Sequence, residues 1–372
     1  MNKTIVLSGI NLVDGGAYSI YTDCLDEIVN SNLDKENKII ALVSKKSLFT
    51  KYSGSQIEFI EFPKSKKSWL YRIYYEYIFF NKLSKKLNPD VWLSLHDITP
   101  NVHAKRQYVY CHNPSPFYNM KFSEIKYGWK YYMFSKFYKY LYRINIYKNT
   151  EVIVQQRWLK EEFKRMFKLN NIVVARPSLR DIRKPNENLK KEIQMGRKAT
   201  VTFVYPSYPR PYKNFELLCE AAKRLSNSGI KFNVYITLAG NENRYSKMLY
   251  AKYGDVNGIK FVGLMSRNEL YKLYAKSDCL VFTSKLETLG MPIIEYKLFN
   301  KAMILAELPY AHETVGDYDK VLFTPINDVD LMVCNMKKII DGNYQENNFS
   351  KIKYDNEPDY ENWNELLNYL IS

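Results

Sequence analysis

The sequence predicts an α/β protein that folds into two domains of similar architecture. At 372 residues the chain is longer than one ordinary hydrophobic core accounts for, and its hydrophobic fraction of 46% is enough to fill two cores. A buried apolar run, a loop and an amphipathic helix follow one another twice, first from Ile5 and again from Ala199. This alternation is typical of parallel sheets of the dinucleotide-binding type, so we expect two Rossmann-like domains.

The first half opens with a strand at Ile5–Gly9, a loop that contains Asp14, Gly15 and Gly16, and then a helix. Further strands are expected at Ile39–Val43, Ile57–Phe59, Asn88–His96, Gln107–His112 and Glu151–Gln156, the last of which closes the first half. His112 falls at the end of its strand, directly before a proline-rich loop, and should therefore point toward the ligand-binding edge of the sheet. A histidine at a strand end is often merely structural, and His96 and His103 are weaker candidates for a functional role.

The second half begins after an irregular polar stretch, and we place the domain boundary near residues 177–190. Its strands are expected at Ala199–Tyr205, Asn233–Gly240, from Ile259, at Asp278–Phe282 and at Ala302–Ala306, whereas Leu308–Gly316 is expected to be a loop. Ser266 followed by Glu269 three residues later predicts a helix start with a capping box. The segment Tyr360–Ile371 has apolar residues at helical spacing and predicts a terminal helix.

The charge of the chain is concentrated in its first half. The net charge is +16, of which residues 1–180 carry +14, from 29 basic and 15 acidic residues. This asymmetry indicates an anionic partner for the first half: a phospholipid surface, a pyrophosphate-linked acceptor or nucleic acid.

The cysteines and the apolar runs indicate where the protein works. The five cysteines are scattered and include no CxxC pair, which favours free thiols in a reducing compartment over disulfides or a zinc site. The N-terminal apolar run is too short for a signal peptide, and no run is long enough to span a membrane. We therefore expect a cytoplasmic protein.

The sequence is organised around residues 283–295, which follow the apolar run Asp278–Phe282. Gly290 allows backbone to approach a ligand closely, and Pro292 suits the first position of a helix. A strand, a loop and a helix N-terminus in this order form the usual ligand site of an open α/β sheet. Glu287 and Glu295 bracket the turn, eight positions apart, and are suited to accept hydrogen bonds from neutral hydroxyls. The alternative without a ligand is that one glutamate lies in a solvated loop and the other is favoured by the helix dipole.

Glu287 through Glu295 resembles the E-x7-E signature of retaining GT-B glycosyltransferases of glycosyltransferase family 4. The resemblance covers most of the chain and is densest at residues 199–325. It implies two Rossmann-like domains that face each other across a cleft, with a C-terminal helix that crosses back to the first domain. We accordingly expect an acceptor-binding domain at 1–180, a nucleotide-sugar-binding domain at 181–355 and the returning helix at 356–372.

The resemblance also implies roles for individual residues. His112, Glu287 and Lys213 would be catalytic, with Lys213 placed at a strand-to-helix turn that suits a diphosphate. The family usually has an arginine five residues before this lysine; Tyr208 stands there instead, and Arg210 is the nearest substitute. The residues expected to bind the donor are Gly15, Gly16, Arg210, Lys213, Gly263, Met265, Glu287, Thr288, Leu289, Gly290 and Glu295.

Residues 126–148 carry six Lys or Arg, ten aromatic residues and no acid. Interleaved aromatic and basic residues on a helix suit a membrane interface or a nucleic-acid surface, and a half-buried helix with snorkelling lysines is the plainer alternative. We assign Lys130, Lys136 and Arg143 from this stretch, together with Asp14, to acceptor binding.

The sequence thus predicts a retaining hexosyltransferase that needs no metal and uses a UDP- or GDP-sugar. Its expected acceptor is a lipid-pyrophosphate-linked glycan or an oligosaccharide, in the synthesis of a surface polysaccharide such as capsule or O-antigen. The expected location is the inner face of the plasma membrane, bound peripherally to anionic lipid. The alternatives are a GT-B sugar-nucleotide epimerase or hydrolase, and a nucleic-acid-binding protein that uses residues 126–148.

Overall fold

The computed structural model describes residues 2–118, 120–176, 200–343 and 358–372, which form two compact units. Unit 1 comprises Met1–Pro116, Phe137–Leu179 and Glu357–Ser372, and unit 2 comprises Phe117–Lys136 and Arg180–Asn356. The expected boundary at 177–190 falls outside the described residues. Residues 117–136 belong to unit 2 although they lie within the range expected for the first domain.

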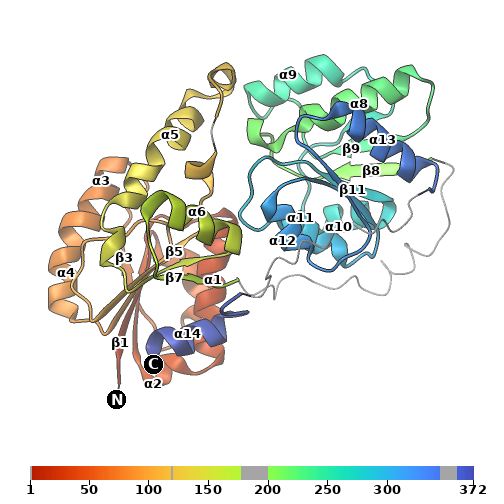
Figure 1. Cartoon of the computed structure of the whole chain (residues 1–372). Helices are drawn as coiled ribbons and strands as arrows, with labels where there is room; N and C mark the ends of the chain where they lie inside the picture. The colour runs from red at the N-terminus through yellow and green to blue at the C-terminus, as the bar shows by residue number, and fades with distance from the viewer. Residues whose placement is uncertain (1, 119, 177–199, 344–357) are drawn as a thin grey trace. The chain divides into compact units, whose positions relative to one another are not determined.

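Unit 1 is built on a parallel sheet that has seven strands among the described residues, in the order β3-β2-β1-β4-β5-β6-β7 (Figure 1). The strands are β1 (Thr4–Gly9), β2 (Lys38–Val43), β3 (Glu58–Glu61), β4 (Val91–Ser94), β5 (Arg106–Cys111), β6 (Glu151–Val154) and β7 (Ile172–Val174). The central strands are buried along almost their whole length, which explains why they read in the sequence as continuous apolar runs.

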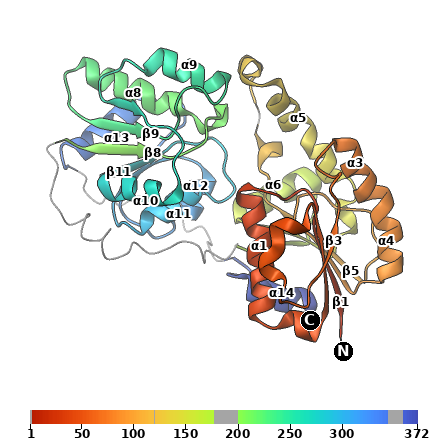
Figure 2. The same ribbon diagram turned by 180° about the vertical axis from the view of Figure 1, so that it is seen from behind.

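Helices cover both faces of this sheet (Figures 1 and 2). They are α1 (Gly15–Asn30), α2 (Leu33–Glu36), α3 (Trp69–Tyr74), α4 (Phe80–Leu87), α6 (Arg157–Phe167) and α14 (Trp363–Ile371), with a π-helical turn η2 (Tyr75–Phe79) and short 3₁₀ turns η1 (Lys46–Tyr52) and η5 (Ile146–Lys148). The 3₁₀ turn η3 (Ser115–Phe117) and helix α5 (Trp129–Arg143) each span a boundary between the units, and the 3₁₀ turn η4 (Phe122–Tyr127) belongs to unit 2. Helix α5 begins in residues of unit 2 and ends in residues of unit 1. On the face opposite α1, Phe80 of α4 packs against Trp92 of β4.

The C-terminal helix α14 packs on unit 1, as the sequence predicts. Trp363, Leu366 and Leu370 are buried in the same apolar cluster as residues of α1, and the Trp363 ring lies 5.4 Å from that of Tyr110. The chain therefore returns to its first sheet after completing the second.

Unit 2 contains a second parallel sheet, with six strands among the described residues, in the order β10-β9-β8-β11-β12-β13. The strands are β8 (Thr202–Tyr205), β9 (Asn233–Ile236), β10 (Ile259–Phe261), β11 (Cys279–Phe282), β12 (Ala302–Ala306) and β13 (Val321–Thr324). Its helices are α8 (Phe215–Asn227), α9 (Arg244–Tyr253), α10 (Arg267–Lys276), α11 (Met291–Lys297), α12 (Pro309–Val315) and α13 (Val329–Ile340), and a 3₁₀ turn η6 (Pro211–Lys213) precedes α8. The expected capping box is present at α10: Ser266 N donates to Glu269 Oε2 at 2.8 Å.

Three local expectations were wrong. Strand β7 lies beyond β6, so Glu151–Gln156 does not close the first sheet; three apolar residues are too few to reveal a strand without its partner. The segment expected to be a loop at 308–316 contains α12, which Pro309 opens because its φ is preset for a helix and its missing N–H is not needed there. Gly15 and Gly16 are the first two residues of α1 and not part of a loop.

Candidate active site

In each sheet the strand order reverses between two neighbouring strands that are not consecutive in the chain. In unit 2 these are β8 and β11, and in unit 1 they are β1 and β4. The carboxyl ends of such a pair form the usual ligand site of an open α/β sheet, because the connections leave in opposite directions there. The loops after β8 and β11 carry Lys213 and Glu287, which the sequence analysis singled out.

Lys213 and Glu287 form an ion pair in unit 2. Lys213 ends η6, Asn214 follows in the left-handed conformation with φ 57°, and α8 then begins. Lys213 Nζ donates to Glu287 Oε1, and each side chain is only 14% exposed. A partly buried ammonium needs such a counter-charge, since leaving it unpaired would cost several kcal/mol of desolvation.

The loop that carries Glu287 is fixed by contacts along its whole length. Tyr310 donates its hydroxyl to the carbonyl of Ser284 at 2.8 Å, and the amide of Lys285 donates to the carbonyl of Tyr212 at 2.7 Å. Thr314 donates to the carbonyl of Leu289 at 2.6 Å. The bond of Lys285 ties the loop to the turn of Lys213, and the other two bonds tie it to α12. The position of Glu287 is therefore set by backbone contacts as well as by its ion pair.

Gly290 ends this loop with φ 67°, a conformation that favours glycine. A Cβ atom added there would lie 3.2 Å from Cδ1 of Ile293, which is closer than normal packing allows. Leu289 before it is buried and Thr288 is half-buried. Pro292 is the second residue of α11 and not the first, since Met291 begins the helix.

Glu295 lies on α11 and is buried. Its Oε1 is 3.4 Å from Arg267 Nη2, and its Oε2 is 3.4 Å from the hydroxyl of Tyr274; both partners come from α10. Burial raises the pKa of the Glu295 carboxyl, and the Arg267 guanidinium and then the Tyr274 hydroxyl oppose that shift. Sequence reasoning missed both partners, although an arginine in the first turn of a helix is an unfavourable placement that signals a specific counter-charge.

The other residues expected to bind the donor lie in separate turns of unit 2. Gly263 has φ 78° and donates its amide to the carbonyl of Leu238 at 3.1 Å, and Met265 two residues later is half-buried. Arg210 opens the turn that Lys213 ends, and its guanidinium lies 5.6 Å from the ring centroid of Tyr208. The aromatic residue that replaces the family's arginine therefore carries a cation on its ring.

The segment 117–136 contacts the same part of unit 2, which sequence reasoning did not predict. The Tyr118 and Tyr212 rings lie 5.8 Å apart, and Glu124 Oε1 is 3.8 Å from Lys285 Nζ. Tyr118 also donates its hydroxyl to Glu124, at 3.0 Å to Oε1. This segment thus braces the turns on which Lys213 and Glu287 stand.

In unit 1 the predicted loop residues lie at the start of α1. Asp14 precedes the helix without capping it through its side chain, and Asp14, Gly15 and Gly16 are exposed. A Cβ atom added at Gly16 would meet nothing within 4 Å. An uncapped helix N-terminus with open backbone amides is suited to an anionic or hydroxyl-bearing ligand.

His112 follows β5 in unit 1 and is anchored by Asp97, which follows β4. The backbone amide of His112 donates to Asp97 Oδ1 at 2.7 Å, and its Nε2 lies 3.5 Å from Asp97 Oδ2. Asp97 was not singled out from the sequence; its signal is a buried charged residue two positions after the apolar run that ends at Leu95.

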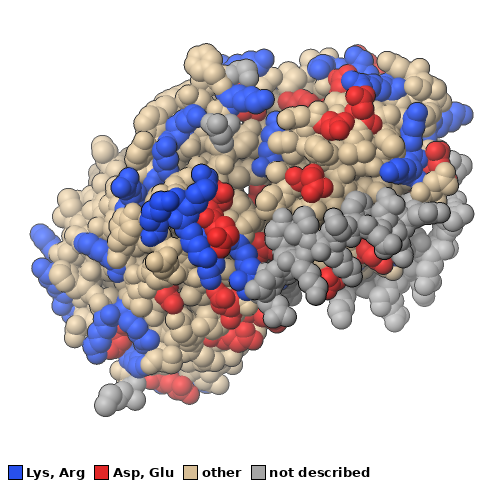
Figure 3. All heavy atoms as spheres, viewed as in Figure 1, with Lys and Arg blue, Asp and Glu red and all other residues tan. Residues whose placement is uncertain are grey.

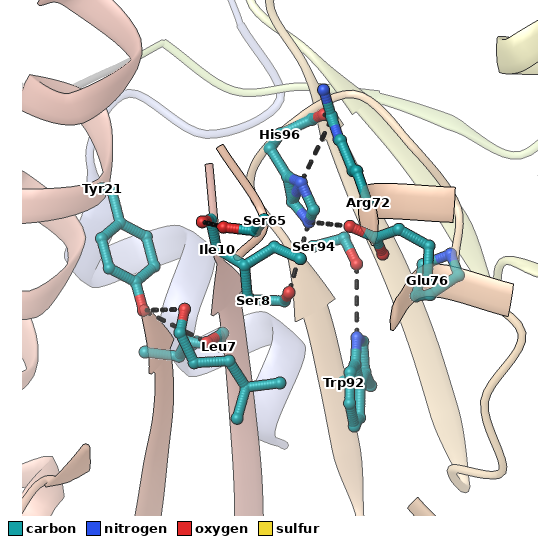
Figure 4. A network of polar contacts seen from close by, with 12 residues as sticks. Leu7, Ser8, Ile10, Tyr21, Ser65, Arg72, Glu76, Trp92, Ser94 and His96 are labelled. Carbon is teal, nitrogen blue, oxygen red and sulfur yellow. Dashed lines mark hydrogen bonds and ion pairs between the residues drawn. The ribbon is translucent and has the colours of Figure 1, made fainter. Parts of the chain in front are cut away.

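A buried polar network lies beside this site (Figure 4). His96 Nε2 is 3.2 Å from the hydroxyl of Ser8 and 3.4 Å from Glu76 Oε1, and Arg72 donates to the carbonyl of His96 at 2.9 Å. Burial raises the pKa of Glu76 to about 8, and burial and then the neighbouring Arg72 hold the pKa of His96 well below its usual range. At neutral pH both groups are therefore largely uncharged, and the contact between them is not an ion pair.

Helix α5 presents aromatic and basic side chains to solvent. Tyr138 and Tyr142 are buried, whereas Trp129, Met133, Phe137 and Tyr140 are 62, 40, 52 and 54% exposed. Of the residues assigned to acceptor binding, Lys136 is half-buried and Arg143 exposed, and the side chain of Lys130 lies outside the described residues. Figure 3 shows Lys and Arg gathered over the region of α5 and α6 on the face in view.

Two features are absent from the described part of the chain. No helix there is both long and apolar enough to cross a membrane. Within the same residues, no group of three or more His, Cys, Asp or Glu side chains is placed to hold a metal ion.

Residues 186–356 match the family model described as Glycosyl transferases group 1. This part of the chain, a little under half of it, belongs to the group 1 glycosyl transferases. The matched residues include Lys213, Glu287 and Glu295, so the ion pair and the buried carboxylate of unit 2 lie within the part that defines the family. This glycosyltransferase uses a nucleotide-sugar donor, and its family is retaining and metal-independent. Comparison with curated proteins gives no match.

Solved structures show that the glycosyltransferase has the GT-B fold. A glycosyltransferase from Rickettsia africae is 18% identical with a TM-score of 0.63, and the alignment covers 91% of this chain and 88% of that one. Anabaena Alr3699/HepE, solved in complex with UDP-glucose, is 16% identical with a TM-score of 0.57, over 93% and 92% of the two chains. The lipopolysaccharide outer core galactosyltransferase WaaB is 13% identical with a TM-score of 0.61, over 99% of each chain.

Proposed function

We propose that this glycosyltransferase moves a hexose from a UDP- or GDP-sugar to a lipid-pyrophosphate-linked glycan or an oligosaccharide, as one step in building a surface polysaccharide such as capsule or O-antigen. The observation that carries the proposal is the ion pair of Lys213 and Glu287, which lies in the loops after β8 and β11, where the strand order of unit 2 reverses. It joins a cation suited to a diphosphate with a carboxylate suited to sugar hydroxyls. A nucleotide sugar presents both groups next to each other.

In this proposal the donor is held mainly by unit 2. Lys213 binds the diphosphate, with Arg210 and the backbone amides that follow Gly290 as further donors of hydrogen bonds. Glu295 accepts from the ribose hydroxyls, and the nucleobase lies against the backbone from Gly263 to Met265. Glu287 and the half-buried Thr288 lie beside the transferred sugar.

The proposal also gives roles to residues of unit 1. His112 contacts the transferred sugar, and Gly15 and Gly16 face the sugar and phosphate of the donor. Asp14, Lys130, Lys136 and Arg143 bind the acceptor. The support is chemical: exposed amides at the start of α1 suit phosphate, and the basic side chains of α5 suit an acceptor that carries a pyrophosphate.

The proposed reaction proceeds by attack from the face that the leaving group occupies. The bond from the anomeric carbon to the diphosphate oxygen breaks, and the acceptor hydroxyl oxygen bonds to the same carbon. The departing phosphate oxygen takes the hydroxyl proton, so no separate base is needed. Negative charge that grows on the diphosphate is stabilised by Lys213 and by the preorganised amides of the turn.

A panel of UDP-, GDP- and dTDP-sugars tests the proposal. A true donor should raise the melting temperature of the protein, because a ligand of the native state stabilises it. The same donor should then be consumed only when a glycan acceptor is present, in excess EDTA as well as in buffer. Consumption of the sugar nucleotide without any acceptor would favour the epimerase or hydrolase instead. Salt-sensitive binding of nucleic acid that survives loss of Glu287 would favour a nucleic-acid-binding protein.

The basic half of the chain further suggests where the reaction occurs. The exposed aromatic residues of α5 alternate with Lys136, Lys139 and Arg143, a composition that suits the headgroup region of an anionic membrane. Among the similar structures, WaaB is by its name a galactosyltransferase of the lipopolysaccharide outer core. We therefore place the enzyme on the inner face of the plasma membrane.

A further inference from the structure

Asp97 occupies a strained corner between β4 and β5 in unit 1. Its backbone has φ 73°, a left-handed conformation that a residue other than glycine adopts at a cost. Arg72 holds the preceding residue in place by donating to its carbonyl. Strain of this kind persists only where other contacts fix the residue, so the contacts of the Asp97 side chain are informative.

One oxygen of Asp97 is fully used by structural hydrogen bonds. Oδ1 accepts from the backbone amides of His112 at 2.7 Å and Asn113 at 3.0 Å, and from the hydroxyl of Tyr142 at 3.0 Å. These three donors come from two separate elements, the end of β5 and helix α5. They fix the rotation of the carboxylate, and its second oxygen, Oδ2, is thereby aimed at the imidazole of His112.

The contact between Oδ2 and the imidazole selects one tautomer of His112. Nε2 lies 3.5 Å from Oδ2, which is too far for a strong hydrogen bond. At this distance the electrostatic interaction between the carboxylate oxygen and the ring nitrogen still depends on whether Nε2 carries a proton. A carboxylate oxygen can only accept, so it attracts an N–H and repels a lone pair on Nε2. The neutral imidazole therefore carries its proton on Nε2, and Nδ1 presents a lone pair.

The other ring nitrogen has no use inside the protein. Nδ1 of His112 is buried and has no hydrogen-bond partner in the described part of the chain. A buried acceptor without a donor destabilises the native state, so a donor from a ligand would be favourable there. A hydroxyl group of a ligand would supply the missing donor.

We propose that Asp97 is a positioning residue which holds His112 as the Nε2–H tautomer, so that Nδ1 accepts a hydrogen bond from a hydroxyl of the transferred sugar. The tautomer follows from the contacts of Asp97 alone, whereas the sugar as the donor of the hydrogen bond rests on the proposed function. In this tautomer Nδ1 of His112 is an acceptor, and the substrate group that meets it must be a donor.

Asp97→Asn is the sharpest variant because it changes one atom of the arrangement. The amide oxygen can replace Oδ1 and keep its three hydrogen bonds, while the NH₂ group replaces Oδ2 and donates toward Nε2. The imidazole proton is then driven to Nδ1, which would present a donor to the sugar. Tyr142→Phe is the matched control, since it removes one bond to Oδ1 and leaves Oδ2 unchanged.

The tautomer can be observed directly by two-bond ¹H–¹⁵N correlation spectra of protein labelled with ¹⁵N-histidine, recorded at pH 8.5. This is about two units above the ordinary imidazole pKa of about 6.5, so neutral rings dominate. The signals of His112 are those that His112→Gln removes. We expect Nε2–H in the wild type and in Tyr142→Phe, and Nδ1–H in Asp97→Asn. An Nδ1–H ring in the wild type would overturn the proposal, and this measurement needs no substrate.

The role of Nδ1 toward the sugar is tested with the donor that the panel identifies. Asp97→Asn should lower kcat about tenfold or more and change the donor KM less than twofold, while Tyr142→Phe changes neither beyond its effect on stability. A tautomer that switches as expected with kcat unchanged would overturn the sugar contact. If the wild type turns over no donor in the panel, the proposed function fails, and the spectra still decide the tautomer.

Discussion

Nζ of Lys213 donates to Oε1 of Glu287, and this ion pair joins two turns that lie 74 residues apart in the sequence. Each side chain is the counter-charge of the other, and together they are nearly shielded from solvent. A diphosphate that binds Lys213 must compete with Glu287 for it. In the ion pair the two charges neutralise each other. Replacing Lys213 should therefore lower the affinity for the nucleotide, whereas replacing Glu287 should not lower it.

Lys213→Met should weaken UDP binding by about 1–3 kcal/mol, the worth of one hydrogen bond between charged groups, as measured by isothermal titration calorimetry. Glu287→Gln should leave UDP affinity equal or higher, because Lys213 is released, yet lower turnover because a sugar contact is lost. Arg224→Met is the control: it breaks the exposed pair of Arg224 and Asp330 in the same unit and should alter neither. Equal weakening of UDP by both active-site variants would contradict the competition.

Glu295 and Arg267 predict how nucleotide affinity depends on pH. Burial raises the pKa of Glu295, so its carboxylate is protonated at a higher pH than an exposed glutamate, and affinity should fall as the pH drops through that raised value. Arg267→Met removes the cation that opposes the shift, which should move the loss of affinity to higher pH. Titrations of UDP from pH 5 to 8 decide this, and parallel profiles for the wild type and Arg267→Met would argue against the assignment of Glu295.

The sequence was most informative where a single segment determines its own conformation. The capping box of Ser266 and Glu269 needs only residues three apart, and Gly290 with Pro292 marks a helix start within a few positions. Both could be predicted because the physical cause is local. The positions of most strands could also be predicted, since buried parallel strands read as continuous apolar runs, whereas their order in each sheet could not.

The contacts missed from the sequence all join residues far apart in the chain. Arg267 meets Glu295 from another helix, and Asp97 meets Tyr142 across 45 residues. The segment 117–136 lies in the first half of the sequence but packs with unit 2. No local pattern encodes such pairings, because the fold alone brings the partners together.

Glu76 predicts a stability that falls as the pH rises. Its pKa is about 4.5 in the unfolded chain and is raised to about 8 by burial, with Arg72 opposing, so the native state binds its proton more tightly. The stabilisation is complete below about pH 4.5 and is lost progressively as the pH rises toward 8. The neighbouring His96, 3.4 Å away, has a lowered pKa and is present in wild type and variant alike, so its titration largely cancels in the difference.

The free energy of unfolding of Glu76→Gln should therefore rise relative to that of the wild type as the pH rises. The difference should change by an amount on the order of a few kcal/mol between pH 5 and 9. Thermal or urea unfolding across this range measures it. The control is Glu61→Gln at an exposed position, which should run parallel to the wild type. A Glu76→Gln curve that also stays parallel would show that Glu76 does not titrate as its burial requires.

Helix α5 predicts reversible binding to anionic membranes. Its exposed side carries Trp129, Met133, Phe137 and Tyr140, which would settle at the depth of the headgroups while neighbouring bases meet lipid phosphates. Each base near an anionic surface contributes roughly 1 kcal/mol. The protein should co-sediment with vesicles that contain phosphatidylglycerol, and the bound fraction should fall with added salt.

Two sets of variants separate charge from position in this experiment. Co-sedimentation should be abolished when three bases of α5 are changed together to Glu: Lys136, Lys139 and Arg143. Most of it should remain when the same change is made at three exposed lysines on α9, α10 and α13, which are Lys247, Lys272 and Lys337. Phe137→Ser should weaken membrane binding because it removes apolar area that the membrane would bury. The dependence of binding on salt should stay the same, because no charge is removed. Equal sedimentation with phosphatidylcholine alone, or equal losses from both charge reversals, would mean that α5 is not the docking surface and would leave the glycosyltransferase assignment untouched.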